Sequence, residues 1–362
     1  MHRRDVRDRQ SLIARRVASI SLSVLGCLIF AQPTRAQVNL GPITLGAGMR
    51  TSYYHYSPDI GNTADRFPLD SARLYINGPV TSKIKFMFNT EYNGATNAVG
   101  ILDAVARIEL HPMFNVWAGR VLPPSDRANL AGPYYNNHWG VFSDGIQNGH
   151  PSVFQGRDNG VVYWGDYFKK RVKVSAGAFD GGTATNKSDV LGAFRVQLDL
   201  LDPEDGYYLN STYYGEKKLL AIAGATQIQA GGTATTIDFL YESKIGDAGV
   251  ITIEGEFANY NKLGGYDPNY RKSSGTYGLA AYIFPKAMGP GKIQLLGKYA
   301  KADFSHSING ATSYNQKTTE FNINYLIKDF NARVMSFYKN TQFTLPGKPD
   351  FYQLGIGLQI QM

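Results

Sequence analysis

The sequence predicts an all-β fold, a transmembrane antiparallel β-barrel of 16 strands with a long third extracellular loop folded into its interior. Three observations point to this fold. Apolar and polar residues alternate in segments of about ten residues, aromatic residues gather at the segment ends, and short and long linkers follow one another. A tilted strand needs about ten residues to cross a bilayer, whereas strands of soluble sandwiches average about five or six.

The N-terminus has the layout of a secretory signal peptide. Residues 1–16 carry six arginines against two aspartates, and residues 17–31 form an apolar stretch. That stretch is shorter than the roughly 20 residues of a spanning helix. Thr34 and Ala36 then place small side chains at the third and first positions before Gln37. We expect two regions, a signal peptide over 1–36 and a barrel domain over 37–362.

Two other export signals fit the leader less well. The segment that ends at Cys27 is loosely similar to a lipoprotein box, but Leu25 is bulky for its position there. The pair Arg15-Arg16 suggests twin-arginine export, yet that route carries folded proteins, and a barrel must insert from an unfolded state. A cleaved signal peptide and a bacterial outer-membrane location remain the expectation.

Composition excludes several classes of function. Without residues 1–36 the chain has 30 basic and 27 acidic side chains, a net charge of +3, which gives no support to nucleic-acid binding. Cys27 is the only cysteine and lies in the leader, so the barrel domain has no disulfide or thiol chemistry. No metal-ligand spacing links the histidines of that domain, and we expect no metal or cofactor: His55, His111, His138, His150 and His306.

Alternation with period two defines the strands. In residues 83–92, for example, Ile84 and Phe86 lie on one face while Lys85 and Glu91 lie on the other. We predict strands over 43–56, 69–78, 83–92, 101–110, 113–120, 160–167, 171–179, 190–201, 218–228, 235–243, 250–260, 274–284, 292–302, 316–327, 331–340 and 350–361.

Aromatic placement and linker lengths favour a membrane barrel over a soluble sandwich. Tyr and Phe crowd the segment ends, which suits girdles at the two membrane interfaces. From the C-terminus back to residue 244, long and short linkers alternate, as expected for outer loops and periplasmic turns. A seventeenth segment, Tyr207–Tyr214, would make the strand number odd. As a periplasmic connector it leaves sixteen strands and puts both termini on the periplasmic side.

The longest linker, residues 121–159, becomes the third outer loop. A loop of this length is usually either functional or disordered. Its many aromatic side chains argue for an ordered loop, because large apolar rings must be buried against other residues. We expect the loop to fold into the barrel and to narrow the pore as a constriction loop. An external cap or a flap at a trimer contact is the alternative. The candidate residues of the loop are Asp126, Arg127, Tyr134, Tyr135, His138, Asp144 and Arg157.

Five stretches occur in an order that resembles one family. They are Ala72–Gly78, Gly119–Pro124, Arg157–Val161, Ser175–Gly181 and Leu201–Tyr208. Each motif is weak alone, but their succession over most of the chain after Gln37 is similar to that of the phosphate-selective porins, the porin O and P family. The resemblance implies a trimeric, sixteen-stranded porin of the Gram-negative outer membrane, with an inward third loop and basic residues that guide anions.

The chain departs from this family in two places. Family members selective for phosphate carry lysines on the third loop, and here no lysine occurs between Lys85 and Lys169. The charged side chains in the loop are two basic and three acidic ones: Arg127, Arg157, Asp126, Asp144 and Asp158. Barrels of this kind usually end in Phe, whereas this chain ends in Met362. The barrel is therefore implied more firmly than phosphate as its substrate.

Charged residues at inward positions of the predicted strands suggest what the pore passes. The candidate pore-lining residues are Arg50, Arg73, Lys85, Glu91, Asp103, Arg107, Glu109 and Arg195. Further acids also fall on the inward face: Asp199, Glu254, Glu256 and Glu320. Basic groups along a narrow path raise the local anion concentration. We expect diffusion of small hydrophilic solutes or inorganic anions, with a mild anion preference from the basic cluster on the first four strands.

Two other functional classes find less support. An outer-membrane enzyme needs a Ser, His and acid constellation, and no histidine here sits in a recognisable nucleophile motif. His138 and His150 are the only pair near carboxylates, those of Asp144 and Asp158. We do not expect an enzyme. An adhesin or structural barrel would show long repetitive outer segments, and the sequence contains none.

Overall fold

The computed structural model describes residues 38–40, 42–140, 149–181 and 189–362. The chain divides into two units, residues 1–36 and 37–362, and the second unit is the barrel. The predicted signal peptide lies outside the described residues.

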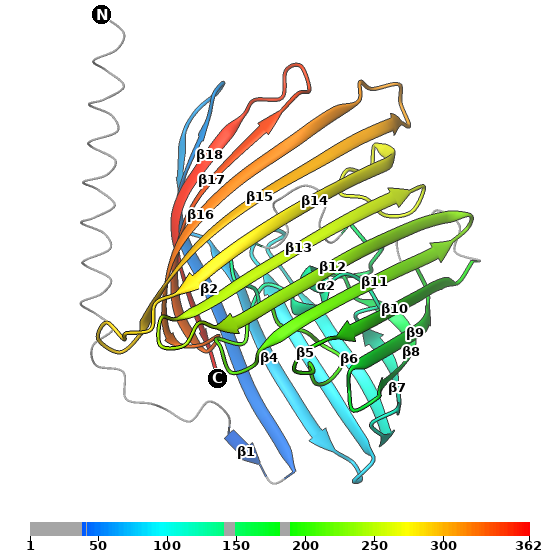
Figure 1. Cartoon of the computed structure of the whole chain (residues 1–362). Helices are drawn as coiled ribbons and strands as arrows, with labels where there is room; N and C mark the ends of the chain where they lie inside the picture. Colours follow the sequence, from blue (N-terminus) through cyan, green and yellow to red (C-terminus); the bar gives the residue numbers. More distant parts are fainter. Residues whose placement is uncertain (1–37, 41, 141–148, 182–188) are drawn as a thin grey trace, which may run out of the picture. The chain divides into compact units, whose positions relative to one another are not determined.

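Sixteen long antiparallel strands form a closed barrel (Figure 1). They are β2 (Ile43–Pro58), β4 (Leu69–Pro79), β5 (Ile84–Asn93), β6 (Ala98–His111), β7 (Phe114–Val121), β8 (Asp158–Tyr167), β9 (Val172–Phe179), β10 (Leu191–Asp199), β11 (Leu219–Gln229), β12 (Gly232–Lys244), β13 (Val250–Asn261), β14 (Tyr270–Ile283), β15 (Lys292–Ser307), β16 (Tyr314–Lys328), β17 (Ala332–Phe343) and β18 (Phe351–Gln361). Short strands β1 (Val38–Leu40) and β3 (Ala64–Arg66) also pair with β2.

All sixteen predicted strands are confirmed. The largest difference in a boundary is at the end of β15, which continues to Ser307 instead of residue 302. Tyr207–Tyr214 contains no strand, as the sixteen-strand count required. The ring closes because β18 pairs with β2 in antiparallel register. The last residue continues this pairing, since the Ala47 amide donates to the Met362 carbonyl at 2.9 Å and the Met362 amide donates back at 2.8 Å.

Alternating side chains give the barrel two different faces. In β12, Thr236 and Asp238 are buried on the inner face, while Ile237 and Phe239 between them are exposed on the outer face. The same alternation runs through the neighbouring strands, so the outer wall is apolar and the inner wall is polar. Such a wall suits lipid outside and water or polar segments inside.

The predicted linker rhythm holds only in part. The turn at residues 284–291 is longer than the outer loop at 308–313, because β15 extends further than predicted, and two more loops on the long-loop end are short. Only residues 230–231 join β11 to β12, and both Ala230 and Gly231 have positive φ, 49° and 72°. This geometry is that of a two-residue hairpin turn. Only residues 94–97 join β5 to β6. At the opposite end the linkers have two to five residues, except for residues 284–291 between β14 and β15 and residues 200–218 between β10 and β11.

The described residues contain one helix, α2 (Arg127–Ala131), in the third loop. No helix among them is long and apolar enough to cross a membrane.

Candidate functional site

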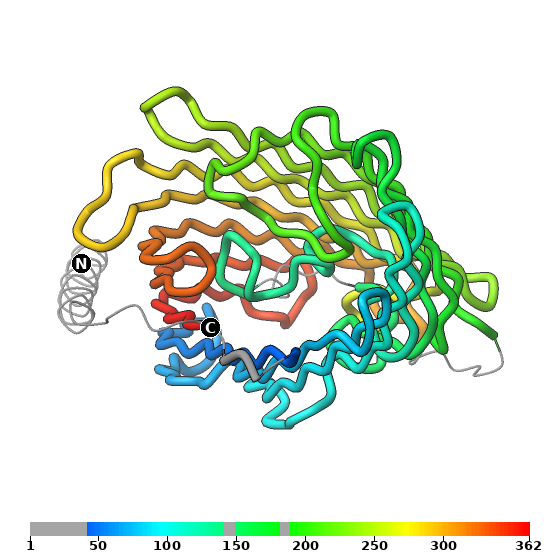
Figure 2. The backbone as a smooth tube through the Cα atoms, turned by 90° about the horizontal axis from the view of Figure 1, so that it is seen from below, coloured from blue at the N-terminus to red at the C-terminus, as the bar shows by residue number. Residues whose placement is uncertain are grey.

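Two segments occupy the interior of the barrel from opposite ends. The described parts of the third loop, residues 122–140 and 149–157, belong to the long-loop end, and the connector, residues 200–218, belongs to the turn end. Figure 2 shows both segments within the ring of strands. They meet where the Tyr207 hydroxyl donates to the Leu122 carbonyl at 2.6 Å and the Ser211 amide donates to the Tyr135 carbonyl at 3.0 Å. The predicted inward course of the third loop is confirmed, and the alternative of an external cap is wrong.

A local cap shapes the first half of the third loop. Asp126 precedes α2, and its Oδ1 accepts the Asn129 amide at 2.7 Å, as expected of an N-cap residue. The other oxygen of Asp126 lies 3.1 Å from His150 Nε2. Gly132 ends the helix with a φ of 64°. Asp126 therefore fixes the loop conformation, and both of its carboxylate oxygens face protein groups.

Arg127 links the loop to the connector. Its guanidinium forms a two-pronged pair with Glu204, Nη1 to Oε1 at 2.9 Å and Nη2 to Oε2 at 2.5 Å, and also donates to the Asn210 carbonyl at 2.9 Å. Both side chains of the pair are fully buried. Burial alone raises the pKa of the Glu204 carboxyl, but the Arg127 charge and hydrogen bonds outweigh burial and leave that pKa below its ordinary value.

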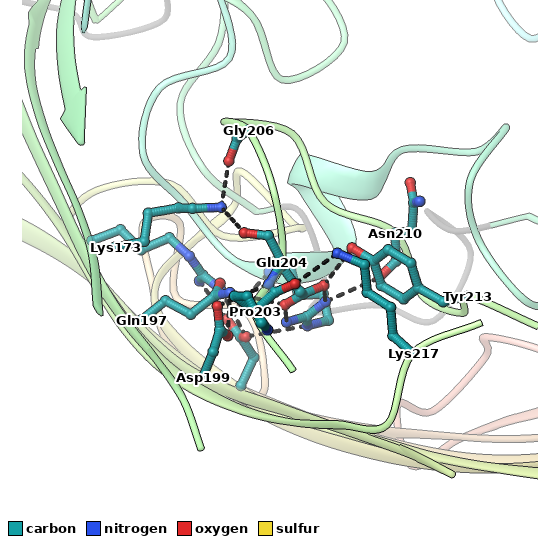
Figure 3. A network of polar contacts seen from close by, with 12 residues as sticks. Lys173, Gln197, Asp199, Pro203, Glu204, Gly206, Asn210, Tyr213 and Lys217 are labelled. Carbon is teal, nitrogen blue, oxygen red and sulfur yellow. Dashed lines mark hydrogen bonds and ion pairs between the residues drawn. The ribbon is translucent and has the colours of Figure 1, made fainter. Parts of the chain in front are cut away.

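Glu204 collects further donors from the barrel wall and the connector. Gln197 Nε2 and the Tyr213 hydroxyl each donate to it at 2.8 Å (Figure 3). Lys173 Nζ donates to the Glu204 carbonyl at 3.0 Å and also to the Gly206 carbonyl. A charged pair with this many additional hydrogen bonds is well satisfied despite its burial.

Arg195 supports the same region from β10. Its guanidinium pairs with Asp238 on β12 through both oxygens, at 2.5 and 2.9 Å, and donates to the Ser125 carbonyl of the loop at 2.9 Å. Arg127 approaches Asp238 as well, with Nε 3.6 Å from Oδ1. The predicted pore-lining Arg195 therefore holds the loop against the wall and has no open solvent before it.

Aromatic rings of the connector pack onto the wall of β7 and β8. The centroids of Tyr207 and Tyr208 lie 5.2 and 5.8 Å from that of Trp117, and Tyr207 also contacts Trp164. Burial raises the pKa of both tyrosine hydroxyls. The sequence prediction treated this segment as a periplasmic connector; in the structure it folds into the lumen, because its rings require apolar cover.

The second half of the loop lies against β15 to β18. Arg333 donates to the carbonyls of Asn136 at 2.6 Å and Tyr134 at 3.1 Å, and Gln359 Nε2 donates to the Tyr134 carbonyl at 2.9 Å. The Tyr135 ring packs edge-on against Phe330 with centroids 5.2 Å apart. These contacts direct the Tyr134 hydroxyl toward β4, where it lies 3.0 Å from the Ser71 hydroxyl.

His138 lies among cations in this half of the loop. Its Nε2 is 3.0 Å from Lys298 Nζ and accepts from that ammonium. Burial and the charges of Lys298 and Lys339 lower the pKa of His138 well below its ordinary value of 6.5. His138 is therefore neutral at physiological pH.

One sector of the inner wall is strongly basic. We call it the basic sector, and its members are Arg50, Arg73, Lys298, Arg333 and Lys339. Arg50 stacks on Trp139 with 3.9 Å between guanidinium carbon and ring centroid, and its Nε and Nη2 are buried with no hydrogen-bond partner among the described residues. Two acids pair with members of the sector, Glu91 with Arg73 at 3.1 Å and Glu320 with Lys339 at 3.6 Å.

Most predicted pore-lining charges of the first strands are paired with one another. Lys85 and Arg107 each lie 2.6 Å from Glu109, and Arg157 of the loop lies 3.3 Å from Asp103. The side chains of Lys85, Arg107 and Glu109 keep 39%, 23% and 15% of their exposure, so water reaches this group. Asp144 lies outside the described residues.

Acids gather on another part of the inner wall. We call this the acidic sector, and its members on β12 and β13 are Asp238, Glu242, Glu254 and Glu256. Glu242 accepts from Thr212 of the connector at 2.6 Å, and Glu254 accepts from Tyr277 at 2.5 Å. The two sectors are neighbours at one edge, because Lys298 Nζ lies 4.6 Å from the centroid of the Tyr277 ring, whose hydroxyl donates to Glu254. Within the described part of the chain, no group of three His, Cys, Asp or Glu could hold a metal ion.

Sequence reasoning missed several residues of this site. Three of them occupy inward positions of predicted strands: Lys298, Arg333 and Lys339. The alternation of inward and outward positions that selected Arg50 would have found them as well. Glu204 lay within a motif that was used only for its family resemblance. Its partner Arg127 was predicted, but pairing across 77 residues leaves no local pattern.

No family model matches the sequence, and no curated protein matches it. Several solved structures match the fold of the chain. The outer membrane channel DcaP of Acinetobacter baumannii has a TM-score of 0.57 at 11% identity, over 88% of this chain and 97% of that one. The anion-selective porin from Comamonas acidovorans has a TM-score of 0.55 at 13% identity, over 88% and 99%.

A third structure is the trimer form of OmpT, an outer membrane protein of Vibrio cholerae. It has a TM-score of 0.54 at 13% identity, over 89% of this chain and 100% of that one. The chain has the fold of the outer-membrane porins. At these identities the likeness extends to the fold alone, and the resemblance to the phosphate-selective family in particular finds no counterpart among the family models.

Proposed function

We propose that the protein is an outer-membrane porin, a water-filled channel for passive diffusion of small hydrophilic solutes with a mild preference for anions. The closed barrel with an apolar outer wall and a charged inner wall supports a path across a membrane. The third loop and the connector narrow that path. We therefore expect a conductance below that of a sixteen-stranded barrel with an empty lumen.

The observation that carries the anion preference is the guanidinium of Arg50. Two of its nitrogens are buried and have no hydrogen-bond partner within the described ranges, and it lies in a sector where cations outnumber acids. A buried cation with unused donors attracts an anion that enters the lumen, because the alternative leaves those donors unsatisfied. The other basic residues predicted on the first four strands, Arg73, Lys85 and Arg107, are by contrast paired with Glu91 or Glu109.

The test is single-channel recording of the refolded chain in a planar bilayer. In a KCl gradient the reversal potential should report a modest anion preference, and Arg50→Gln should shift it toward zero. Lys286→Gln, which removes an exposed charge in the turn after β14, is the matched control. Addition of phosphate distinguishes a phosphate-type pore, which it blocks, from a general anion path. A well-folded barrel without conductance would refute the proposal.

We also propose cleavage before Gln37, export to the outer membrane and assembly as a homotrimer. The boundary between the two units of the chain, after Ala36, supports the cleavage site. The fold shared with a trimeric outer membrane protein supports the assembly. N-terminal sequencing of the membrane-extracted protein should begin at Gln37, and native mass spectrometry should give three copies per particle. A monomer in mild detergent would contradict the trimer.

A further inference from the structure

A basic groove opens at the long-loop end of β13, β14 and β15. It encloses about 550 Å³ and is lined by Asn261, Lys262, Arg271, Lys272, His306, Ser307 and Ile308. The sheet register brings these residues together: Asn261 pairs with Lys272, and Lys272 pairs with Ser305. The Lys262 amide donates to the Arg271 carbonyl at 2.6 Å, so the loop after β13 folds against the start of β14.

The groove concentrates positive charge without a matching acid. Lys262, Arg271 and Lys272 are exposed, and no hydrogen bond or ion pair of their side chains occurs among the described residues. The two acids nearest in sequence are engaged elsewhere. Asp303 pairs with Lys301 at 3.0 Å, and Asp267 accepts from Asn269 and, at 3.0 Å, from the Tyr314 hydroxyl. Three cations thus remain available to an anionic ligand.

The position of Lys272 ties the groove to the outer wall of the barrel. Lys272 is an even number of residues from Thr276 and Gly278 in β14, so the three lie on the same face of the strand. On the neighbouring strands Thr276 pairs with Phe257, and Gly278 pairs with Tyr299. Phe257 and Tyr299 are exposed large side chains of the outer face. The four residues from Phe257 to Asn261 rise about 9 Å along the membrane normal, at roughly 3.3 Å per residue and a tilt near 45°. The groove therefore lies just beyond the lipid-facing band, at headgroup level.

We propose that this groove binds the phosphate groups of a phosphorylated lipid headgroup in the outer leaflet. Phosphate oxygens accept from ammonium and guanidinium donors, and the guanidinium of Arg271 suits two oxygens at once. A free phosphate ion offers the same chemistry. Continuity with the lipid-facing wall favours the headgroup, because a lipid keeps its phosphates at this height while its chains cover Phe257 and Tyr299. The site is separate from the lumen and does not depend on the proposed channel.

The test uses the refolded full chain in detergent and native mass spectrometry with defined lipids. Diphosphoryl lipid A should remain bound, whereas its dephosphorylated form and phosphatidylcholine should not. The variant with Lys262→Gln, Arg271→Gln and Lys272→Gln should bind diphosphoryl lipid A about a hundredfold more weakly, at roughly fivefold for each cation near an anionic headgroup. Retention of the dephosphorylated lipid to the same extent would overturn the proposal.

A matched control exists at the turn end of β14, β15 and the adjacent β16. Lys286→Gln, Lys292→Gln and Lys328→Gln remove three exposed charges near the turns and should leave lipid binding unchanged. Inorganic pyrophosphate is added as a competing ligand in a second experiment. If it binds as tightly as lipid A and displaces it, the groove is a site for free anions and the assignment to lipid is wrong. Heat-dependent gel migration verifies that each variant is folded. An equal loss of lipid A binding in both triple variants would also refute the assignment.

Discussion

The guanidinium of Arg127 and the carboxylate of Glu204 meet inside the barrel, although one residue enters from the loop end and the other from the turn end. The pair is fully buried and has no solvent to compensate the loss of either partner. Removing one member therefore leaves the other charged and unmatched, which costs about 3–5 kcal/mol for buried pairs of this kind.

Arg127→Ala should accordingly release the loop from the connector. We expect a larger and noisier single-channel conductance, together with a lower urea midpoint for barrel unfolding. Glu204→Gln should produce the same direction of change. The variant with Arg127→Met and Glu204→Leu removes both charges and should recover part of the stability. Conductance identical to that of the original chain in all three variants would show that the pair does not hold the constriction.

Acidic pH should weaken the docking of the second half of the loop. The pKa of His138 in the docked loop is lowered by burial and by neighbouring cations, which come from three strands: Lys298 on β15, Lys339 and Arg333 on β17, and Arg50 on β2. A released loop would have a histidine pKa near 6.5 and would bind more protons. Docking is therefore fully stable above pH 6.5 and loses stability as pH falls below that value.

Hydrogen exchange measures this effect. Amides of residues 134–139 should exchange faster at pH 5 than at pH 8 after correction for the intrinsic rate. His138→Gln removes the titrating group and should flatten the difference. The turn at residues 230–231 serves as an internal reference, since no histidine lies near it in sequence. Equal protection at both pH values would argue against a role for His138.

Replacing Arg73, Lys85 and Arg107 with Gln should lower the anion-to-cation permeability ratio. Each replacement frees an acid that now has a basic partner, Glu91 or Glu109, so the lumen gains uncompensated negative charge. The reversal potential in a KCl gradient gives the ratio directly. An unchanged potential would reject electrostatic selection by the first four strands.

Gly119→Ala should impair barrel folding. Gly119 has a φ of 128°, and an added Cβ would lie 2.1 Å from the Ala104 carbonyl oxygen on the neighbouring strand. The backbone strain alone is worth about 1–3 kcal/mol. Gly278→Ala is the control, since its Cβ would meet no atom within 4 Å. Yields of heat-resistant folded barrel should fall for the first variant and not for the second.

Strand positions were predictable because side-chain parity is a local property of the chain. Every strand alternates between lipid and lumen, so hydrophobicity alone gives its position and its facing. The inward course of the third loop was predictable from its rings, of which Trp139 now covers Arg50. The same argument applied to Tyr207 and Tyr208 would have placed the connector inside as well.

Partners across the lumen were not predictable in this way. The basic sector forms only when the barrel closes, because closure joins β2, which carries Arg50, to β18 beside the Arg333 strand β17. Arg333 illustrates the point: it binds carbonyls of Tyr134 and Asn136 that lie about 200 positions away in the sequence, as the 199- and 197-residue separations show. No local pattern encodes contacts of that range.

The meeting of loop and connector also constrains the order of assembly. Each segment enters through a different opening, so neither can be withdrawn while the bond between Arg127 and Glu204 and its surrounding hydrogen bonds persist. During folding, the barrel must therefore admit both segments before the contact forms. In the finished molecule, escape of either segment requires a rare event in which several buried bonds break together. The docked arrangement of loop and connector therefore persists because it opens slowly.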